Sequence, residues 1–259
     1  MRFTIVRVVG NELPPRDQIG SKLKSLQFIL ETEPSTYADK FWVVNHIHNR
    51  QYANEVKSLL KAYNQDFFEI DFLLERYQLM KTFEEKIRYS ININAARNYG
   101  VKHCQQTHQF TICLDQDCFF TEHLLLSAIS NIESDQLVRP DRKYFGLVMK
   151  RLLNAEISDL DNIPNQEPHL IFRNDANEYF DESIVFGQND KIELLHRIGY
   201  NMYSFEISGE HVINVGYVLH TSYGNTLIER DLSTRVNTRK QSLETLVSNL
   251  DSTFTNRVE

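Results

Sequence analysis

Short β-branched runs alternate with amphipathic segments through the first half of the chain, and this alternation is the strongest constraint on the fold. The strand-like runs cover residues 4–9, 41–44, 67–72 and 110–114. The helix-like segments, with apolar residues three and four apart, lie at residues 23–30, 52–60 and 91–104. Strands that alternate with helices form right-handed βαβ units. The sequence therefore predicts an α/β fold, with a mostly parallel sheet and helices on both faces.

The second half of the chain has a looser pattern. Residues 124–132 and 192–198 are typical of helices, residues 144–149, 202–207 and 212–219 of strands, and residues 154–167 of a polar loop. The tail after residue 225 is polar and charged. No repeat or linker divides the chain, and 259 residues suffice for one large α/β domain. We therefore expect one domain over residues 1–259, with halves at 1–120 and 121–259.

Charge and cysteine content narrow the possible partners and compartments. A formal charge of −7 argues against nucleic acid as a partner, because a nucleic-acid footprint needs a basic face. The three cysteines form no C-x-x-C pair, and their odd number favours a reducing compartment. The chain begins without a signal-peptide pattern and has no apolar run near the ~20 residues that span a bilayer. We expect a cytoplasmic protein, either soluble or peripheral at the inner face of a membrane.

The segment Asp115-Gln116-Asp117 carries the sharpest chemical signal. Two carboxylates one residue apart follow a buried apolar run, so they stand at the carboxyl end of a predicted strand. Ligands of open α/β sheets bind at that edge. Mg²⁺ or Mn²⁺ commonly bridges one or two carboxylates to substrate phosphates. The pattern predicts a metal–diphosphate site, and the alternative is a polar turn, in which Asp is also common.

Several short blocks give the chain a resemblance to a known fold family. Ala95-Ala96-Arg97-Asn98-Tyr99-Gly100 precedes the carboxylate pair as an Ala-x-x-Asn-x-Gly helix, and Asn45 and Arg7 stand near earlier strand ends. This arrangement resembles the donor half of GT-A glycosyltransferases, above all the inverting family 2 and β-1,4-galactosyltransferase-type enzymes. The resemblance implies a GT-A fold, a Rossmann-like mixed sheet flanked by helices, in which residues 1–120 bind the donor and residues 121–259 the acceptor.

The resemblance also implies roles for individual residues. The nucleotide-sugar donor, which we expect to be a UDP-sugar, would be bound by Arg7, Asn11, Asn45, Arg97, Asn98, Asp115 and Asp117. Mn²⁺ or Mg²⁺ would be held by Asp115, Asp117 and His220, the last of which follows an apolar run at residues 215–219. For Arg7 and Arg97 a structural ion pair is the alternative, and for His220 an ordinary hydrogen-bonded histidine.

A second block suggests the catalytic base. Gly187-Gln188-Asn189-Asp190 resembles the acidic segment that opens a helix in those families, and its acid deprotonates the acceptor hydroxyl. Asp190 would then promote transfer, with inversion, to a hydroxyl of a glycan or lipid-linked saccharide. The alternative role of Asp190 is an acid favoured at a helix start. Glu182 is a candidate acceptor contact, while Glu193 is expected in solvent.

The sequence departs from the family pattern at two places. Gln188-Asn189-Asp190 holds one acid where the family often has two, and Gly10-Asn11-Glu12 matches the family 2 Tyr-Asn-Glu turn loosely. A non-catalytic carbohydrate- or nucleotide-binding protein on a degenerate transferase fold is therefore the alternative function. A sugar-nucleotide-forming nucleotidyltransferase is disfavoured, because the turn at residues 10–16 holds one glycine and no lysine.

Overall fold

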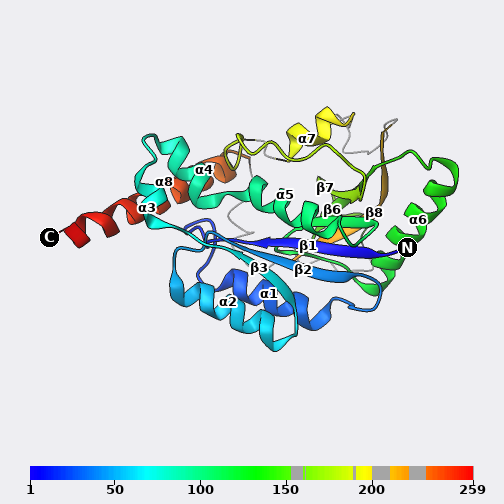
Figure 1. Ribbon diagram of the computed structural model, residues 1–259, viewed down its shortest axis with the longest axis horizontal. Helices are drawn as coiled ribbons and strands as arrows, with labels where there is room; N and C mark the ends of the chain where they lie inside the picture. The colour runs from blue at the N-terminus through cyan, green and yellow to red at the C-terminus, as the bar shows by residue number, and fades with distance from the viewer. Residues whose placement is uncertain (153–159, 161, 189–190, 200–210, 222–231, 259) are drawn as a thin grey trace.

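A computed structural model describes residues 1–152, 160, 162–188, 191–199, 211–221 and 232–258 (Figure 1). Of residues 232, 233, 235 and 254–258 it describes the backbone only. The predicted strand at residues 202–207 lies outside the described residues.

Eight strands form one mixed sheet, in the order β3-β2-β1-β4-β7-β6-β8-β5. The first four are β1 (Phe3–Val9), β2 (Asp39–Asn45), β3 (Asp66–Ile70) and β4 (Phe110–Asp115). The others are β5 (Cys118–Phe119), β6 (Tyr144–Arg151), β7 (Asn165–Arg173) and β8 (Val212–His220). The strands β3, β2, β1 and β4 run parallel, whereas β7 is antiparallel to both β4 and β6, and β5 to β8. The predicted fold class, α/β with a mixed sheet between helices, is confirmed.

Helices cover both faces of this sheet (Figure 1). Apolar side chains of α1 (Ser21–Thr32), α2 (Arg50–Ala62) and α6 (Glu122–Val138) join the main core on one face. On the other face lie α5 (Ile93–Cys104) and α7 (Ile192–Arg197). At one end, α3 (Leu74–Gln78) and α4 (Phe83–Ile91) pack against α8 (Leu232–Val258). None of the described helices is both long and apolar enough to cross a membrane.

The helix α5 lies unusually close to the sheet at Gly100. A Cβ atom added there would overlap the Cγ1 atom of Val6 in β1. Glycine lets the two backbones approach, and this approach fixes α5, which carries Arg97, against the strand before the site. The glycine of the Ala-x-x-Asn-x-Gly block thus has a packing role.

Two sequence predictions need correction, and a helix forms where none was predicted. The predicted helix over residues 91–104 is interrupted at Asn92, whose left-handed φ of 45° ends α4 and precedes α5. The strand β7 begins at Asn165, inside the predicted loop 154–167. The polar tail is the long helix α8, because Leu243, Leu246, Val247 and Leu250 recur at helical spacing and are buried.

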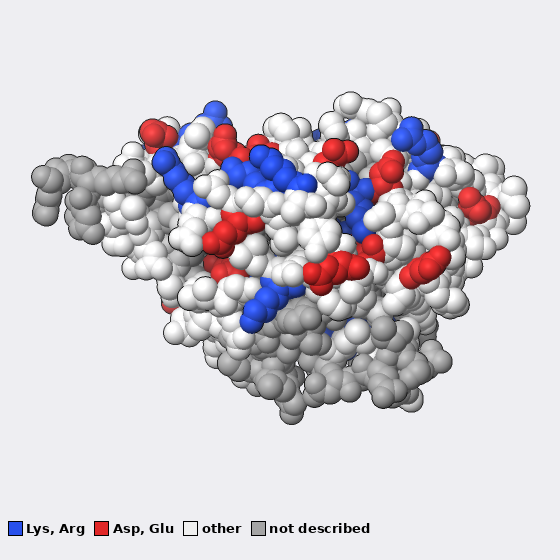
Figure 2. Space-filling model, turned by 90° about the horizontal axis from the view of Figure 1, so that it is seen from below, with Lys and Arg blue, Asp and Glu red and all other residues white. Residues whose placement is uncertain are grey.

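The surface carries charges of both signs. On the face seen from below Figure 1, basic and acidic side chains of the described residues are interspersed (Figure 2). Among these residues, neither sign of charge forms a continuous band across that face.

Candidate active site

The carboxyl ends of β1, β2 and β4 meet at a pocket of about 150 Å³. Its polar lining comprises Asn11, Arg16, Asp17, Ser21, Lys22, Ser25, Asn45, Arg97, Asp115, Gln116 and Asp117. A larger cavity of about 720 Å³ lies at the opposite edge, beside Arg2, Asp39 and Asp66. Ligands of open α/β sheets bind at the carboxyl edge, so the smaller pocket is the candidate site.

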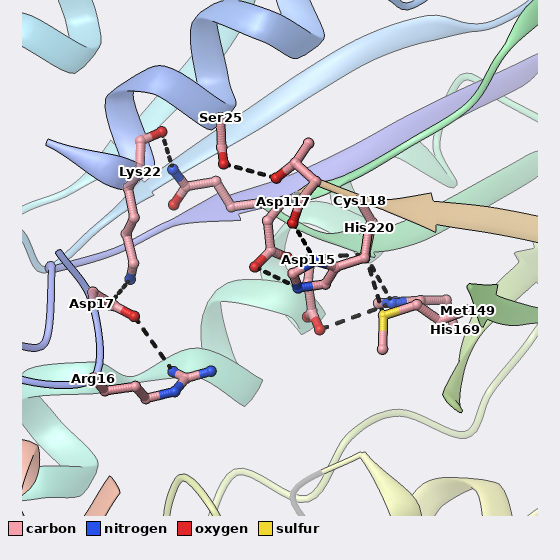
Figure 3. Close-up of polar contacts among 12 residues, drawn as sticks. Arg16, Asp17, Lys22, Ser25, Asp115, Asp117, Cys118, Met149, His169 and His220 are labelled. Atoms are coloured by element: carbon pink, nitrogen blue, oxygen red, sulfur yellow. Dashed lines mark hydrogen bonds and ion pairs between the residues drawn. The ribbon is translucent and has the colours of Figure 1, made fainter. Parts of the chain in front are cut away.

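Asp117 and His220 face each other beside this pocket (Figure 3). The Nε2 atom of His220 lies 2.9 Å from Oδ2 of Asp117. Backbone pairing brings them together, because β5 pairs with β8 so that Cys118 stands opposite His220. The Thr221 N–H also donates to the Asp117 carbonyl at 2.7 Å. Two residues about a hundred positions apart are therefore held by the main chain itself.

The hydrogen bonds of His220 indicate what the pair can hold. Its Nδ1 atom lies 2.6 Å from the Thr221 carbonyl oxygen, which only accepts, so Nδ1 carries a proton. In a neutral imidazole, Nε2 would then point a lone pair at the Asp117 carboxylate. Facing acceptors require a proton or a cation between them, and metal-bound histidines commonly donate their other N–H to a carbonyl. Metal bonds of about 2.1 Å at right angles would place neighbouring ligand atoms about 3 Å apart, which fits this pair.

Asp115, in contrast, is neutralised by basic side chains. Arg97 Nη2 donates to Oδ1 and Lys191 Nζ donates to Oδ2, each at 2.7 Å. His169 Nε2 lies 3.9 Å from Oδ2. Among the described residues, no group of three or more His, Cys, Asp and Glu side chains converges as a metal site. Of the three predicted metal ligands, the structure thus brings together Asp117 and His220 and pairs Asp115 with cations.

Different neighbouring groups lower the pKa values of Asp115 and Asp117. Burial alone would raise the pKa of Asp115, but Lys191 and Arg97 outweigh it and hold that pKa well below its usual range. Burial likewise opposes ionisation of Asp117. A proton on Nε2 of His220, in the place that a metal ion would otherwise take, is the main influence that lowers its pKa. For Lys191, burial would lower the pKa, and the Asp115 and Glu167 carboxylates raise it. Both carboxylates are therefore ionised at neutral pH, and the ammonium is charged.

Cys118, directly after the carboxylate pair, has a histidine partner that the sequence did not reveal. Its Sγ atom lies 3.3 Å from Nε2 of His169 and 3.7 Å from the Met149 sulfur. Burial raises the pKa of the Cys118 thiol well above its ordinary value and lowers that of His169 to about 3. The pair is thus a neutral thiol and a neutral imidazole. This agrees with packing at the strand end rather than nucleophilic catalysis.

The predicted donor contact at Arg7 is wrong. Its side chain is fully buried and forms an ion pair with Glu33, whose side chain is also fully buried. Arg7 Nε donates to the Cys118 carbonyl at 2.9 Å, and the Phe120 N–H donates to Glu33 at 2.9 Å. A guanidinium enclosed in this way cannot touch a nucleotide. Its contacts instead hold the backbone that follows Asp117.

Asn98 also has a structural role in place of the predicted donor contact. Its amide donates to the Phe180 carbonyl at 2.8 Å and accepts from the Phe180 N–H at 3.0 Å. A further N–H donates to Glu182 at 2.9 Å. The side chain is buried and does not line the pocket, so it ties α5 to the segment around Phe180. Its neighbour Arg97 does line the pocket.

Asn11 and Asn45 form part of the pocket wall and hold the loops around it. The Asn11 amide donates to the carbonyls of His46 and Ser90, at 2.8 and 3.2 Å. The Asn45 amide donates to the Ile91 carbonyl at 2.6 Å. These bonds join the ends of β1 and β2 to the region where α4 ends, so both residues position the wall that a donor would meet.

Several residues of the site were not singled out from the sequence. Lys191 and His169 act through Asp115, and Arg16 and Lys22 line the pocket beside Asp17 (Figure 3). Arg16 and Lys22 follow the first predicted strand. Positive charge at the carboxyl end of a strand is typical of phosphate sites, so this position could have identified both residues from the sequence. His169 and Lys191 carry no such signal, because only folding brings them to Asp115.

The predicted base Asp190 lies outside the described residues. Glu182 is exposed and accepts from Asn98. Glu193 forms an ion pair with Arg197 on the surface of α7, at 2.8 Å.

Comparison with known proteins gives structural similarities only. No protein-family model matches the chain, and no curated protein matches it in sequence. Among solved structures, it is similar to a mannosyltransferase from Pyrobaculum calidifontis in complex with GDP-Man and Mn²⁺. That similarity has 12% identity and a TM-score of 0.49, over 95% of this chain and 64% of that one. It is also similar to apo mouse xyloside xylosyltransferase 1, with 11% identity and a TM-score of 0.34, over 82% and 78% of the two chains.

Both similar structures are glycosyltransferases. This chain spans 64% of the length of the mannosyltransferase.

Proposed function

We propose that this chain is a metal-dependent glycosyltransferase of the GT-A type, with residues 1–259 as one domain. The observation that carries the proposal is the Asp117–His220 pair at the carboxyl edge of the sheet, with Nε2 and Oδ2 2.9 Å apart. It lies beside a pocket bounded by three strand ends, where open α/β sheets bind their ligands.

Asp117 and His220 would hold Mn²⁺ or Mg²⁺, with diphosphate oxygens and water as the remaining ligands. An imidazole ligand suits Mn²⁺ better than an all-oxygen set would. The bound metal would neutralise charge on the departing nucleoside diphosphate. Asp115 would support this site indirectly, by holding the Arg97 and Lys191 cations at its edge.

The cations of the pocket support a diphosphate ligand. Arg16, Lys22 and Arg97 line it and balance the three acids of the lining, Asp17, Asp115 and Asp117, so a bound divalent metal would leave a net positive charge for the diphosphate. Lys22 Nζ lies 3.3 Å from Asp17 and donates to the Asn11 carbonyl at 2.5 Å, so its charge stays near the turn after β1. Asn11 and Asn45 would contact the nucleoside from the wall. The donor is proposed to be a UDP-sugar.

Asp190 is proposed as the base that deprotonates an acceptor hydroxyl on a glycan or lipid-linked saccharide, with inversion. The contact between the next residue, Lys191, and Asp115 supports this role, because it ties the start of α7 to the donor side of the site. The enzyme is proposed to act in the cytoplasm, whose reducing conditions suit the free cysteines Cys104, Cys113 and Cys118.

A non-catalytic nucleotide- or carbohydrate-binding protein is the second candidate. It is favoured by the occupation of both Asp115 oxygens by basic side chains. Both candidates bind a nucleoside diphosphate, but the transferase alone would release nucleoside diphosphate from a nucleotide sugar. Slow hydrolysis of UDP-sugars in the presence of Mn²⁺ distinguishes them.

The decisive experiment is a thermal-shift titration with UDP and with GDP, each in Mn²⁺, Mg²⁺ or EDTA. A ligand that binds only the folded chain stabilises it in proportion to the logarithm of its concentration over Kd. We expect one diphosphate to raise Tm much more with metal than with EDTA. Equal shifts with metal and with EDTA would remove the metal from the proposal, and no shift with either diphosphate would refute the donor site.

A further inference from the structure

The first carboxylate of the Asp-x-Asp segment lies within a small group of charged side chains. Lys191 Nζ lies 2.7 Å from Oδ2 of Asp115 and 3.5 Å from Oε1 of Glu167. Arg97 Nη2 lies 2.7 Å from the other Asp115 oxygen. The side chains of Arg97 and Lys191 are 5% and 10% exposed, against 30% for Asp115 and 37% for Glu167. Each Asp115 oxygen therefore already has a buried cation.

The helix that begins at Lys191 holds its side chain in place. Lys191 is the N-cap residue of α7, and the Leu195 N–H donates to the Lys191 carbonyl at 3.3 Å. Leu194 and Leu195, in the first turn of α7, are fully buried in the core on that face of the sheet. The ammonium thus reaches Asp115 from a fixed backbone, unlike that of a lysine on an open surface.

A metal ion that bound Asp115 would have to displace Lys191. It would add two positive charges beside two buried cations, and these charges repel one another. It would also take the carboxylate from Lys191 and leave only the partly exposed Glu167, 3.5 Å away. Separation of a buried ammonium from its partner is strongly unfavourable. The geometry therefore directs a metal away from Asp115.

The remaining protein ligands, Asp117 and His220, are too few to hold the metal tightly by themselves. Mg²⁺ and Mn²⁺ prefer six ligands, and Mg²⁺ usually completes its shell with water and substrate phosphates. Diphosphate oxygens would supply ligands that the protein lacks. Each of the two, metal and nucleoside diphosphate, would then increase the affinity of the site for the other, by the same factor.

We propose that Lys191 is a positioning residue that keeps the metal off Asp115, so that the site holds its metal tightly only together with a nucleoside diphosphate. This proposal rests on the proposed function, because it assumes the metal site at Asp117 and His220. Lys191 acts through Asp115 in this role. The metal would then enter with the nucleotide sugar and leave with the nucleoside diphosphate.

Lys191→Met is the key variant, because it removes the charge and keeps an aliphatic side chain. Asp115 is then free to bind the metal, so Mn²⁺ without nucleotide should bind at least about tenfold more tightly than to the parent. Electron paramagnetic resonance measures this affinity, since the signal of free Mn²⁺ weakens on binding. Lys191→Arg keeps a cation at Asp115 and should bind Mn²⁺ as weakly as the parent does. A purely structural role of Lys191 would lower the affinity, and a decrease would overturn the proposal.

Two controls distinguish ligation by Asp115 from a general effect of charge. Lys22→Met removes a positive charge from the same pocket, but Lys22 is paired with Asp17, at 3.3 Å, so the gain should be much smaller. Lys191→Met combined with Asp115→Asn should show no gain over Asp115→Asn alone, because no carboxylate is freed. A gain in either control as large as that of Lys191→Met in the parent would overturn the proposal.

Lys191→Gln is the second variant, for which the same gain is expected, and it replaces Lys191→Met if that protein does not fold. The titrations are repeated with UDP and with GDP to separate two kinds of failure. If the parent binds Mn²⁺ with a diphosphate but neither variant gains affinity for Mn²⁺ alone, the role of Lys191 is wrong and the metal site stands. If Mn²⁺ binds none of these proteins, with or without diphosphate, the metal site of the proposed function is refuted and the role of Lys191 with it.

Discussion

At the scale of single residues, the site contrasts two carboxylates that are separated by one position. Asp115 lies between Arg97 and Lys191, each 2.7 Å away, whereas Asp117 faces a single histidine. The difference arises because β4 ends at Asp115, and the turn at residues 116–117 then leads into β5, which pairs with the strand of His220. We therefore expect the two aspartates to contribute differently to metal binding.

His220→Ala tests the metal assignment. The variant removes one of the two proposed protein ligands and leaves the β5–β8 backbone pairing intact. Mn²⁺-dependent binding of UDP should weaken by at least the about 10- to 100-fold that loss of an outer-shell partner of a metal typically costs, while the apo protein keeps its fold. Calorimetric titration of UDP with Mn²⁺ measures the effect. Unchanged affinity would make His220 a structural histidine.

Asp190→Asn tests the proposed base. The variant keeps the size of the side chain but removes its basic oxygen, so the rate of transfer should fall by about 10²–10⁴-fold. Donor affinity should stay nearly constant, because a group that acts in the transition state affects kcat more than ground-state binding. Asp117→Asn is the contrast and should lose donor binding as well. Transfer at the parent rate by Asp190→Asn would refute the base.

Arg7→Met tests the structural role found for the first-strand arginine. Removing one partner of a fully buried ion pair typically costs about 3–5 kcal/mol, and the Lys40 ammonium, 3.5 Å from Glu33, should keep the loss at or below the lower end of that range. Lys57→Met, in the partly exposed pair with Glu69, is the control and should cost less than about 1 kcal/mol. Urea unfolding at neutral pH measures both. Comparable losses for the two variants would contradict the buried-pair interpretation.

At the scale of elements, the site depends on two contacts that regular secondary structure provides. The two-residue strand β5 aligns Asp117 with His220, and α5 presses against β1 through Gly100. The helix α1 adds a third, because its Ser25 hydroxyl lies 2.8 Å from that of Thr221, just after His220 (Figure 3). Each contact is buried and involves only a few side chains. A change in one should therefore shift the side chains of the site and leave the pairing of the sheet intact.

Gly100→Ala tests the approach of α5 to β1. The new Cβ would overlap Val6, and overpacking typically costs about 1–3 kcal/mol, against about 1 kcal/mol gained in helix propensity. The double variant Gly100→Ala with Val6→Ala should be less destabilised than the sum of the single variants, since Val6 then makes room. Chemical denaturation of all four proteins completes the cycle. Strict additivity would show that the two residues do not clash.

At the scale of the whole molecule, the candidate active site joins two halves of one mixed sheet. Asp115 and Asp117 leave the parallel half, and His169, Lys191 and His220 arrive from the half that contains β7 and β8. Groups that are buried at this junction therefore affect both the free energy of unfolding and the geometry of the site. His169 is the clearest example, because it is 2% exposed beside Asp115.

His169 predicts a pH dependence of the global stability. Burial is the largest cause that lowers its pKa to about 3, against about 6.5 in an unfolded chain. As the pH falls from about 6.5 towards 3, the unfolded chain takes up this proton first, so folding is progressively destabilised.

The measurement compares the free energy of unfolding of the parent with that of His169→Gln, which cannot take up the proton. The free energy of unfolding of the parent, relative to that of His169→Gln, should decrease as the pH falls, by up to about 1.4 kcal/mol per pH unit. His123→Gln, on the exposed surface of α6, is the matched control. A difference between parent and His169→Gln that does not vary between pH 7 and pH 4 would contradict the buried, neutral state of His169.

Periodicity alone determined most of the first half of the fold. The four predicted strands between residues 4 and 114 correspond to β1 to β4. The apolar runs of β1, β2 and β4 are largely buried, whereas β3 lies at the edge of the sheet and is partly exposed. The Asp-x-Asp segment stands at the end of β4, as predicted. The tail carried no secondary-structure prediction, although Leu243, Leu246, Val247 and Leu250 recur at helical spacing along α8.

Tertiary structure alone decided which groups meet. Whether Arg7 contacts a ligand or Glu33 depends on which face of β1 it occupies and what packs there, and a strand pattern does not show this. The neutralisation of Asp115 by Lys191 joins residues 76 positions apart. The spacing of apolar residues along the sequence shows which side of a helix or strand is buried. Which distant residues then meet depends on how whole helices and strands pack together.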